Sequence, residues 1–306
     1  MLSLSTAWNA ILHDQAQNIL KDIKAMGIFN VELGFNLSRE MIEVIKEFKK
    51  KNLINISSVH NFCPVPDGYV RNEFGPDYFS LASPDEKERS LAIELTKQTI
   101  ITAKEIQANA VIIHAGRVQM QQKTKQLIHL YEQGKKNTPE YKEFLKQMQL
   151  ERDAKKKVYL ESALLSLEEL ISFAKTFQIN VCVENRYYFR EIPCFEELKL
   201  IFEHFGNCDN LFYWHDVGHA QVNENLGFAN HLDFLNTYSN RLLGIHLHDV
   251  IGAQDHKVPG TGNFEFNRLQ PYLKKHTIRV LEVHQPATQS EVLTGISFLK
   301  KMGICD

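Results

Sequence analysis

Short apolar runs alternate with helical stretches along the whole chain, and this alternation constrains the fold more than any other feature. Eight runs have the length and composition of buried strands. They are Leu2–Thr6, Val31–Phe35, Ile54–His60, Ala110–His114, Ile179–Glu184, Leu211–Asp216, Leu242–His248 and Ile278–His284. Alternation of strand and helix indicates a parallel sheet. Eight such units in 306 residues predict a closed (β/α)8 TIM barrel of class α/β, formed by residues 1–306 as a single domain. A doubly wound open sheet is the alternative, but no GxGxxG motif follows the first strand.

The segments between these runs have helical periodicity. They are Asp14–Met26, Arg39–Lys50, Pro84–Gln107, Thr124–Phe177, Cys194–Phe205, Leu232–Tyr238, Phe266–Lys275 and Gln289–Met302. The stretch after strand four is a helical insert much longer than an ordinary helix, so we expect a break near Gly134–Pro139. Residues 118–160 of this insert carry ten Lys or Arg against five Asp or Glu. This bias predicts a solvated helical surface, with a lid that attracts an anionic group as the alternative.

Polar residues stand at the carboxyl ends of several predicted strands. Such residues are His60, His114, Glu184, Asp216, His246, His248, Glu282 and His284. A buried strand rarely carries an unpaired charge, because removing that charge from water costs too much free energy. The carboxyl ends of barrel strands meet at one rim, where barrel active sites form. We therefore expect one shared polar pocket at that rim.

Side-chain alternation within the strands supports this expectation. Residues i and i+2 of a strand lie on the same face. Counting back from the polar residues gives an inner face that includes Ile112, Cys182, Trp214, Gly244 and Val280. The opposite faces are aliphatic, as in Val111 and Ile113 or Val181 and Val183, and suit packing against outer helices.

Three carboxylates and one imidazole from four strands form the strongest candidate metal site. They are Glu184, Asp216, His246 and Glu282. This donor set suits one divalent ion, Mn²⁺, Mg²⁺, Co²⁺ or Zn²⁺. A buried ion-pair network without metal is the alternative, although few basic partners lie on these strands.

Further polar residues near the strand ends are candidates for substrate binding. They are His60, His114, His219, His248, Arg186 and Lys257. His219 follows Asp216 by three residues, and Gly218 permits a tight turn between them. His219 can therefore bind metal or substrate, or orient Asp216. His60 and His114 can line the pocket or complete a second metal site, and His248 competes with His246 for one role.

Whole-chain composition excludes several classes of protein. The net charge is −2, so the chain is not built to coat a nucleic acid. No apolar stretch reaches the length of a membrane span, and the N-terminus lacks the pattern of a signal peptide. Five cysteines without a CxxC pair predict reduced thiols and a cytoplasmic protein.

Taken together, these motifs resemble the sugar phosphate isomerase/epimerase family of xylose-isomerase-like barrels. The resemblance runs from VELGF around Glu32 through VENR (Glu184), Asp-Val-Gly-His (Asp216–His219), His246–Asp249 and the PGTG turn to Glu282. It implies that the four candidate ligands hold one divalent metal. It also implies that Glu184 and Glu282 act as acid and base on opposite faces of a sugar, through a metal-stabilised enediolate. The chain departs from the family's epimerases after the metal histidine, where Asp249, His256 and Lys257 stand instead of Glu and Arg.

These observations predict a metal-dependent isomerase or epimerase of a small sugar, sugar phosphate or polyol derivative. The principal rival is a zinc phosphodiesterase similar to endonuclease IV, for which His60, His114, His219 and Asp255 stand at suitable positions. A lyase or dehydratase on the same barrel, and a barrel that binds a sugar without turnover, are further alternatives. A homo-oligomer is compatible with the sequence.

Overall fold

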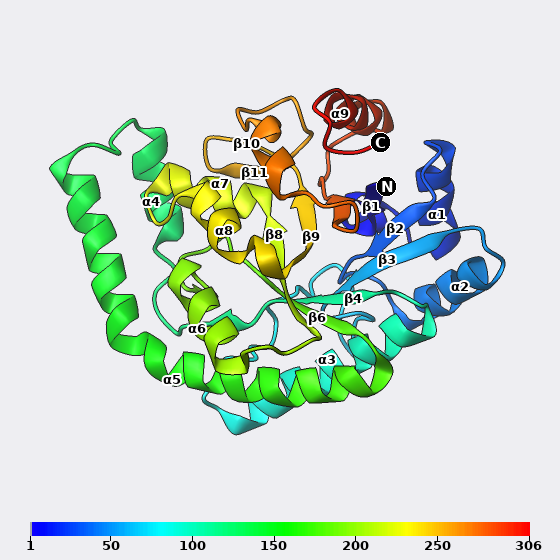
Figure 1. Ribbon diagram of the computed structural model, residues 1–306, viewed down its shortest axis with the longest axis horizontal. Coiled ribbons are helices and arrows are strands. Elements are labelled where there is room, and N and C mark those ends of the chain that lie inside the picture. Colours follow the sequence, from blue (N-terminus) through cyan, green and yellow to red (C-terminus); the bar gives the residue numbers. More distant parts are fainter. Residues whose placement is uncertain (1) are drawn as a thin grey trace.

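The eight predicted strands form one closed parallel barrel. The computed structural model describes residues 2–306 (Figure 1). The barrel strands are β1 (Leu2–Ser5), β2 (Asn30–Leu33), β3 (Asn55–His60), β4 (Ala110–Ile113), β6 (Asn180–Glu184), β8 (Leu211–Asp216), β9 (Leu242–Leu247) and β12 (Ile278–Leu281). Each strand pairs in parallel with the next, and β12 pairs with β1 to close the ring. The predicted (β/α)8 barrel is therefore confirmed.

Helices surround the barrel and connect its strands (Figure 1). The outer helices are α1 (Ala16–Ala25), α2 (Arg39–Lys50), α3 (Glu86–Glu105), α6 (Phe195–Phe205), α8 (His231–Tyr238) and α9 (Gln289–Lys301). Short 3-10 helices η1 (Thr6–Trp8), η2 (Ala10–Leu12) and η3 (Ser239–Arg241) complete the connections. No helix within residues 2–306 has the length and apolar content needed to cross a membrane.

The two faces of the strands bury two different cores, as their side-chain alternation predicts. Ile112, Cys182, Trp214 and Val280 pack together inside the barrel. The aliphatic residues of the opposite faces join the larger core beneath the helices. Gly244 leaves the space that Trp214 fills, since a Cβ there would lie 2.1 Å from the indole ring. The barrel interior is thus a packed floor below the polar rim.

The long insert contains two helices, α4 (Thr124–Glu132) and α5 (Pro139–Phe177), so the predicted break is confirmed. Thr138 begins α5 by accepting a hydrogen bond from the Tyr141 N–H, and Pro139 occupies the first turn, where it costs no hydrogen bond. The second half of α5 packs into the main core. The first half extends along the barrel, where Tyr141 and Met148 form a smaller core with residues of α7 and β10 (Figure 1).

Two connections differ from the prediction. The Asp-Val-Gly-His segment is not a turn, because α7 (Val217–Leu226) begins directly after Asp216, whose side chain accepts the His219 N–H and caps the helix. The predicted helix Phe266–Lys275 is instead a 3-10 helix, η4 (Phe266–Tyr272), which contains Pro271. Two small antiparallel two-stranded sheets lie outside the barrel: β5 (Gly116–Arg117) pairs with β7 (Glu191–Ile192), and β10 (Asp249–Ile251) forms a hairpin with β11 (Gln254–Lys257).

Candidate active site and metal centre

The four candidate metal ligands converge on one point at the carboxyl rim of the barrel. Strand register places Asp216 beside His246, and Glu184 ends the neighbouring strand. His246 Nδ1 lies 2.6 Å from Glu184 Oε1, 3.0 Å from Glu282 Oε2 and 3.6 Å from Asp216 Oδ2. All four side chains are buried.

This arrangement fits a divalent cation. The imidazole nitrogen of His246 can donate its single proton to only one of the three carboxylates around it. Three carboxylate oxygens thus face one nitrogen that carries at most one proton, and a cation at this point would compensate their negative charge. Their ligand atoms and the imidazole nitrogen all lie within 4.8 Å of one another. Carboxylate oxygens with one imidazole match the ligands that Mn²⁺, Mg²⁺, Co²⁺ and Zn²⁺ take in proteins.

Electrostatic interactions and burial shift the pKa values of Glu184 and Glu282 in opposite directions. Burial acts to raise the pKa of Glu184, but hydrogen bonds with His114 and His246 hold it well below its usual value. Burial also raises the pKa of Glu282, and there the nearby His246 and His256 offset only part of the effect. For His246, burial lowers the pKa, and the surrounding carboxylates outweigh burial and raise it well above its usual value.

Glu32 is a buried part of the site that the sequence analysis missed as a functional residue. It lies in β2 and is fully buried. Its carboxylate oxygens lie 3.0 and 3.1 Å from His246 Nε2, and Ser58 donates a 2.8 Å hydrogen bond to it. Glu32 therefore orients the His246 ring from the side opposite the other carboxylates. A carboxylate within the apolar run Val31–Phe35 was the signal available in the sequence.

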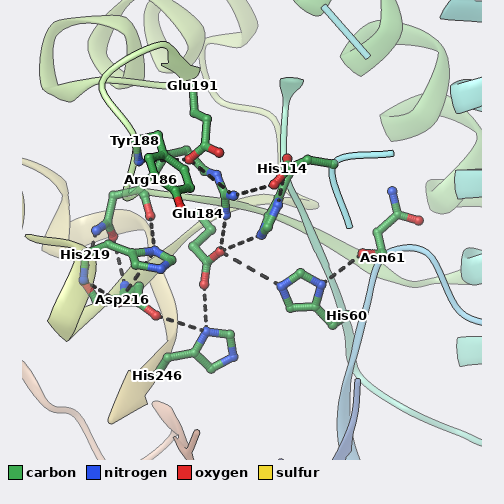
Figure 2. A network of polar contacts seen from close by, with 12 residues as sticks. His60, Asn61, His114, Glu184, Arg186, Tyr188, Glu191, Asp216, His219 and His246 are labelled. Carbon is green, nitrogen blue, oxygen red and sulfur yellow. Dashed lines mark hydrogen bonds and ion pairs between the residues drawn. The ribbon is translucent and has the colours of Figure 1, made fainter. Parts of the chain in front are cut away.

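The second oxygen of Glu184 faces a separate group of side chains (Figure 2). His114 Nε2 lies 3.0 Å from Glu184 Oε2, Arg186 donates to the same oxygen at 2.9 Å, and His60 Nε2 lies 4.0 Å away. His60, His114 and Glu184 offer ligand atoms that lie within 4.8 Å of one another. Asp77 joins His114 to Arg186 from the far side, at 3.0 Å to each.

A third group lies around Asp216. His219 Nδ1 lies 3.0 Å from the backbone oxygen of Asn185, and its Nε2 lies 3.5 Å from Asp255. His219, Asp255 and His256 likewise offer ligand atoms within 4.8 Å of one another. The pKa of His256 is raised to about 9, because the charge of Asp255 outweighs burial, which alone would lower it.

His248 lies behind Asp216. Its Nε2 is 3.0 Å from both oxygens of that carboxylate, and its Nδ1 accepts a hydrogen bond from the His256 backbone. Gly218 is required by this packing, because a Cβ there would lie 2.0 Å from the His248 ring. The role of Gly218 is thus close approach of helix α7 to His248 rather than the tight turn that we expected.

Asp249 holds the PGTG turn by its backbone. One carboxylate oxygen accepts from the N–H groups of Val250 and Phe264, and the other from those of Gly260 and Gly262. The four distances are 2.8 to 3.0 Å. The glycine N–H groups of the turn therefore point to Asp249 and not to a ligand.

The three groups open into a cavity of about 350 Å³. Its walls include His60, His114, Glu184, Arg186, His219, Glu282 and His284, with Phe35, Tyr187 and Tyr188. Among the described residues, neither His248 nor Lys257 nor any residue of the insert 118–160 lines this cavity. The other four candidates, His60, His114, His219 and Arg186, line the cavity. Their contact with a substrate stays a prediction.

Several cavity residues come from the connections between barrel strands and helices, where sequence periodicity gives no signal. Asp77 lies in the segment between β3 and α3, Glu191 begins β7, and Asp255 lies in β11. Glu191 is buried beside Arg186, at 3.4 Å, and burial raises its pKa.

Comparison with known proteins defines the class of this barrel. Residues 20–302 match the family described as Xylose isomerase-like TIM barrel, and the chain belongs to that family. No curated protein sequence matches the chain.

Solved structures of the same fold include sugar epimerases. A candidate xylose isomerase from Rhodospirillum rubrum has 16% sequence identity and a TM-score of 0.70, over 100% of this chain and 99% of that one. A D-tagatose 3-epimerase-like protein has 19% identity and a TM-score of 0.66, over 98% of this chain and 96% of that one. A D-psicose 3-epimerase crystallised in the presence of D-fructose has 12% identity and a TM-score of 0.63, over 99% of each chain. At these identities the similarity shows the fold alone.

Proposed function

We propose that this protein is a divalent-metal-dependent isomerase or epimerase of a small sugar, sugar phosphate or polyol derivative. The observation that carries the proposal is the convergence of Glu184, Asp216 and Glu282 on His246 Nδ1 at the carboxyl rim. Family membership and the sugar epimerases among the structures of the same fold support it.

Glu184, Asp216, His246 and Glu282 would hold the metal. A divalent ion held there would supply Lewis-acid polarisation of substrate oxygens, which makes a C–H bond next to a carbonyl more acidic. Glu32 fixes the imidazole of His246 and so the direction of its Nδ1.

In the mechanism we propose, Glu184 and Glu282 act on opposite faces of the substrate carbon. In the proposed reaction, Glu184 accepts the proton from that carbon, and the electron pair of the C–H bond stays on the substrate. Glu282 donates a proton to the opposite face, which inverts the carbon.

The remaining wall would position the sugar. Arg186, His114 and His219 line the cavity with hydrogen-bonding groups, and Tyr187 and Tyr188 add aromatic surface. The hydrogen-bonding groups would bind the hydroxyls of the sugar, and the aromatic rings would contact the non-polar face of the sugar ring.

Substitution of each glutamate tests the two-carboxylate mechanism. Glu184→Gln and Glu282→Gln should each lower the rate of solvent-deuterium incorporation into a ketose by about 100-fold or more, because each removes one proton-transfer group. The rate is measured by NMR in D₂O at saturating Mn²⁺, with circular dichroism to verify the fold. Glu203→Gln on the exposed face of α6 is the matched control and should exchange at the wild-type rate. Wild-type exchange in either active-site variant would exclude this mechanism.

A zinc phosphodiesterase is the second candidate, and one observation favours it. Three further groups of donors adjoin the central four ligands: one with His60 and His114, one with His219 and Asp255, and one in which His248 and His256 join Asp216 and Glu282. Such an arrangement can hold more than one ion. Metal analysis of the purified protein separates the candidates, since one ion per chain supports the isomerase and three zinc ions support the phosphodiesterase.

A further inference from the structure

A second cavity lies beside the first and shares two of its walls. Its volume is about 330 Å³, close to the 350 Å³ of the cavity that holds the candidate active site. Phe35 and His284 line both cavities. Phe35 also packs edge-on against His60, with 5.8 Å between the ring centroids. A substituent on a ligand at the metal centre would therefore have to cross Phe35 and His284 to reach the second cavity.

The exposed surface of the second cavity is mostly non-polar, and its lining also includes Asn36, Asn72 and Gln285. Ala7, Ile11, Phe35 and Phe74 provide the carbon surface. Arg71 is the only Lys, Arg, Asp or Glu among the described residues that line it. Ile11 is 51% exposed although it is a large aliphatic residue. The cavity thus offers apolar contact at the edge of a polar site.

Arg71 builds the wall and is not available to bind an anion. Its guanidinium nitrogens donate to the backbone oxygens of Ala10, Asn36 and His13, at 2.7, 3.3 and 2.8 Å. A further bond reaches Asp14 at 3.2 Å. These contacts join the segments that follow β1, β2 and β3. The second cavity is consequently preformed, which reduces the ordering cost of binding, and these oxygens already occupy hydrogen-bond donors of Arg71.

We propose that the substrate carries an apolar substituent about the size of an aromatic ring, and that the second cavity binds this substituent. The inference rests on the proposed function, because the sugar part is placed at the metal centre. It narrows the substrate class from small sugars and sugar phosphates to carbonyl sugars or polyols with an uncharged apolar extension.

Equilibrium binding of matched ligands tests the proposal. The ligands are D-fructose, its 1-O-benzyl and 6-O-benzyl ethers, and fructose 6-phosphate, each titrated by calorimetry into the Mn²⁺-saturated protein. At least one benzyl ether should bind about 10-fold or more tightly than D-fructose, as expected for partial burial of a phenyl ring. The phosphate should give no gain. Equal affinities, failure of all ligands to bind, or a gain for the phosphate alone would overturn the proposal.

Two neighbouring residues provide a matched pair of variants. Ile11 lines the second cavity, whereas Leu12, which is 58% exposed in the same 3-10 helix η2, does not. Ile11→Asp should remove the advantage of the benzyl ether, and Leu12→Asp should retain it. Loss of the advantage in both variants, or in neither, would contradict the assignment of the cavity. Thermal unfolding of each variant verifies that the fold is intact.

Deuterium exchange separates this inference from the proposed reaction. If D-fructose incorporates deuterium but neither benzyl ether binds more tightly than D-fructose, the proposed substrate class is wrong and the proposed reaction stands. If a benzyl ether binds more tightly than D-fructose but no ligand incorporates deuterium, the proposed reaction is wrong and the second cavity stands as a binding site.

Discussion

His246 has acceptors at both ring nitrogens. Its Nε2 faces Glu32, and its Nδ1 faces the three carboxylates of the metal site. A neutral imidazole that donates from Nε2 to Glu32 keeps the Nδ1 lone pair free to bind a metal. Glu32 therefore selects the protonation state that makes His246 a ligand.

Glu32→Gln tests this selection. The amide is uncharged and can donate to Nε2, so the variant should bind Mn²⁺ about 10- to 100-fold more weakly than wild type. Calorimetric titration of metal-free protein measures the affinity. Ser58→Ala is the control, because it removes one hydrogen bond to Glu32 but keeps the carboxylate. Unchanged affinity in Glu32→Gln would contradict the role of this residue.

At the residue scale, the sequence indicated the four residues that converge. It did not indicate Glu32, which contacts His246, or Asp77, which contacts His114. The ligands stand at the ends of apolar runs, where a buried charge is anomalous. Glu32 occupies the second position of its predicted strand, whereas the candidate residues were those at the carboxyl ends of strands. Asp77 comes from the segment between β3 and α3, and only the folded chain brings it to His114.

The β9–η4 connection depends on one buried carboxylate. Asp249 accepts four backbone N–H groups and so fixes both the start of β10 and the PGTG turn. A buried carboxylate with four donors gains strong hydrogen bonds that offset its desolvation.

Asp249→Asn should lower the free energy of unfolding by about 2 to 3 kcal/mol. The amide group would face N–H donors that need an acceptor and would leave them unpaired. Urea denaturation measures the loss. Asp153→Asn on the exposed face of α5 is the control and should change stability by about 0.5 kcal/mol or less. Equal stability of the two variants would show that the turn does not depend on Asp249.

At the element scale, the sequence predicted the barrel strands and most helices because hydrophobic periodicity marks both. Helix α7 was missed because Gly218 suggests a turn, and the contact with His248 that makes glycine necessary there is tertiary. Pro271 in the predicted last connection was a visible sign that a regular α-helix would not form.

The whole molecule should gain stability from a divalent metal. Binding to the folded state alone adds about 2.7 kcal/mol when the ion is present at 100 times its dissociation constant. For a chain of this length, the corresponding rise in Tm is about 4 °C. Thermal unfolding with Mn²⁺ and after EDTA treatment measures the shift. Asp216→Asn should reduce it, and a wild-type Tm that is indifferent to metal would argue against the site.

Helix α5 belongs to two separate cores, and this has a consequence for the motions of the protein. Its second half is part of the main core, whereas its first half packs with Leu226 and Val250 in the smaller core that also contacts Tyr187. Small cores open more readily than large ones, and hydrogen exchange reports each as a separate unit. Amides of α4 and of the first half of α5 should therefore exchange before those of β6 and β8. Tyr187 lines the cavity, so we expect local opening of the smaller core to widen this side of the cavity while the barrel stays folded.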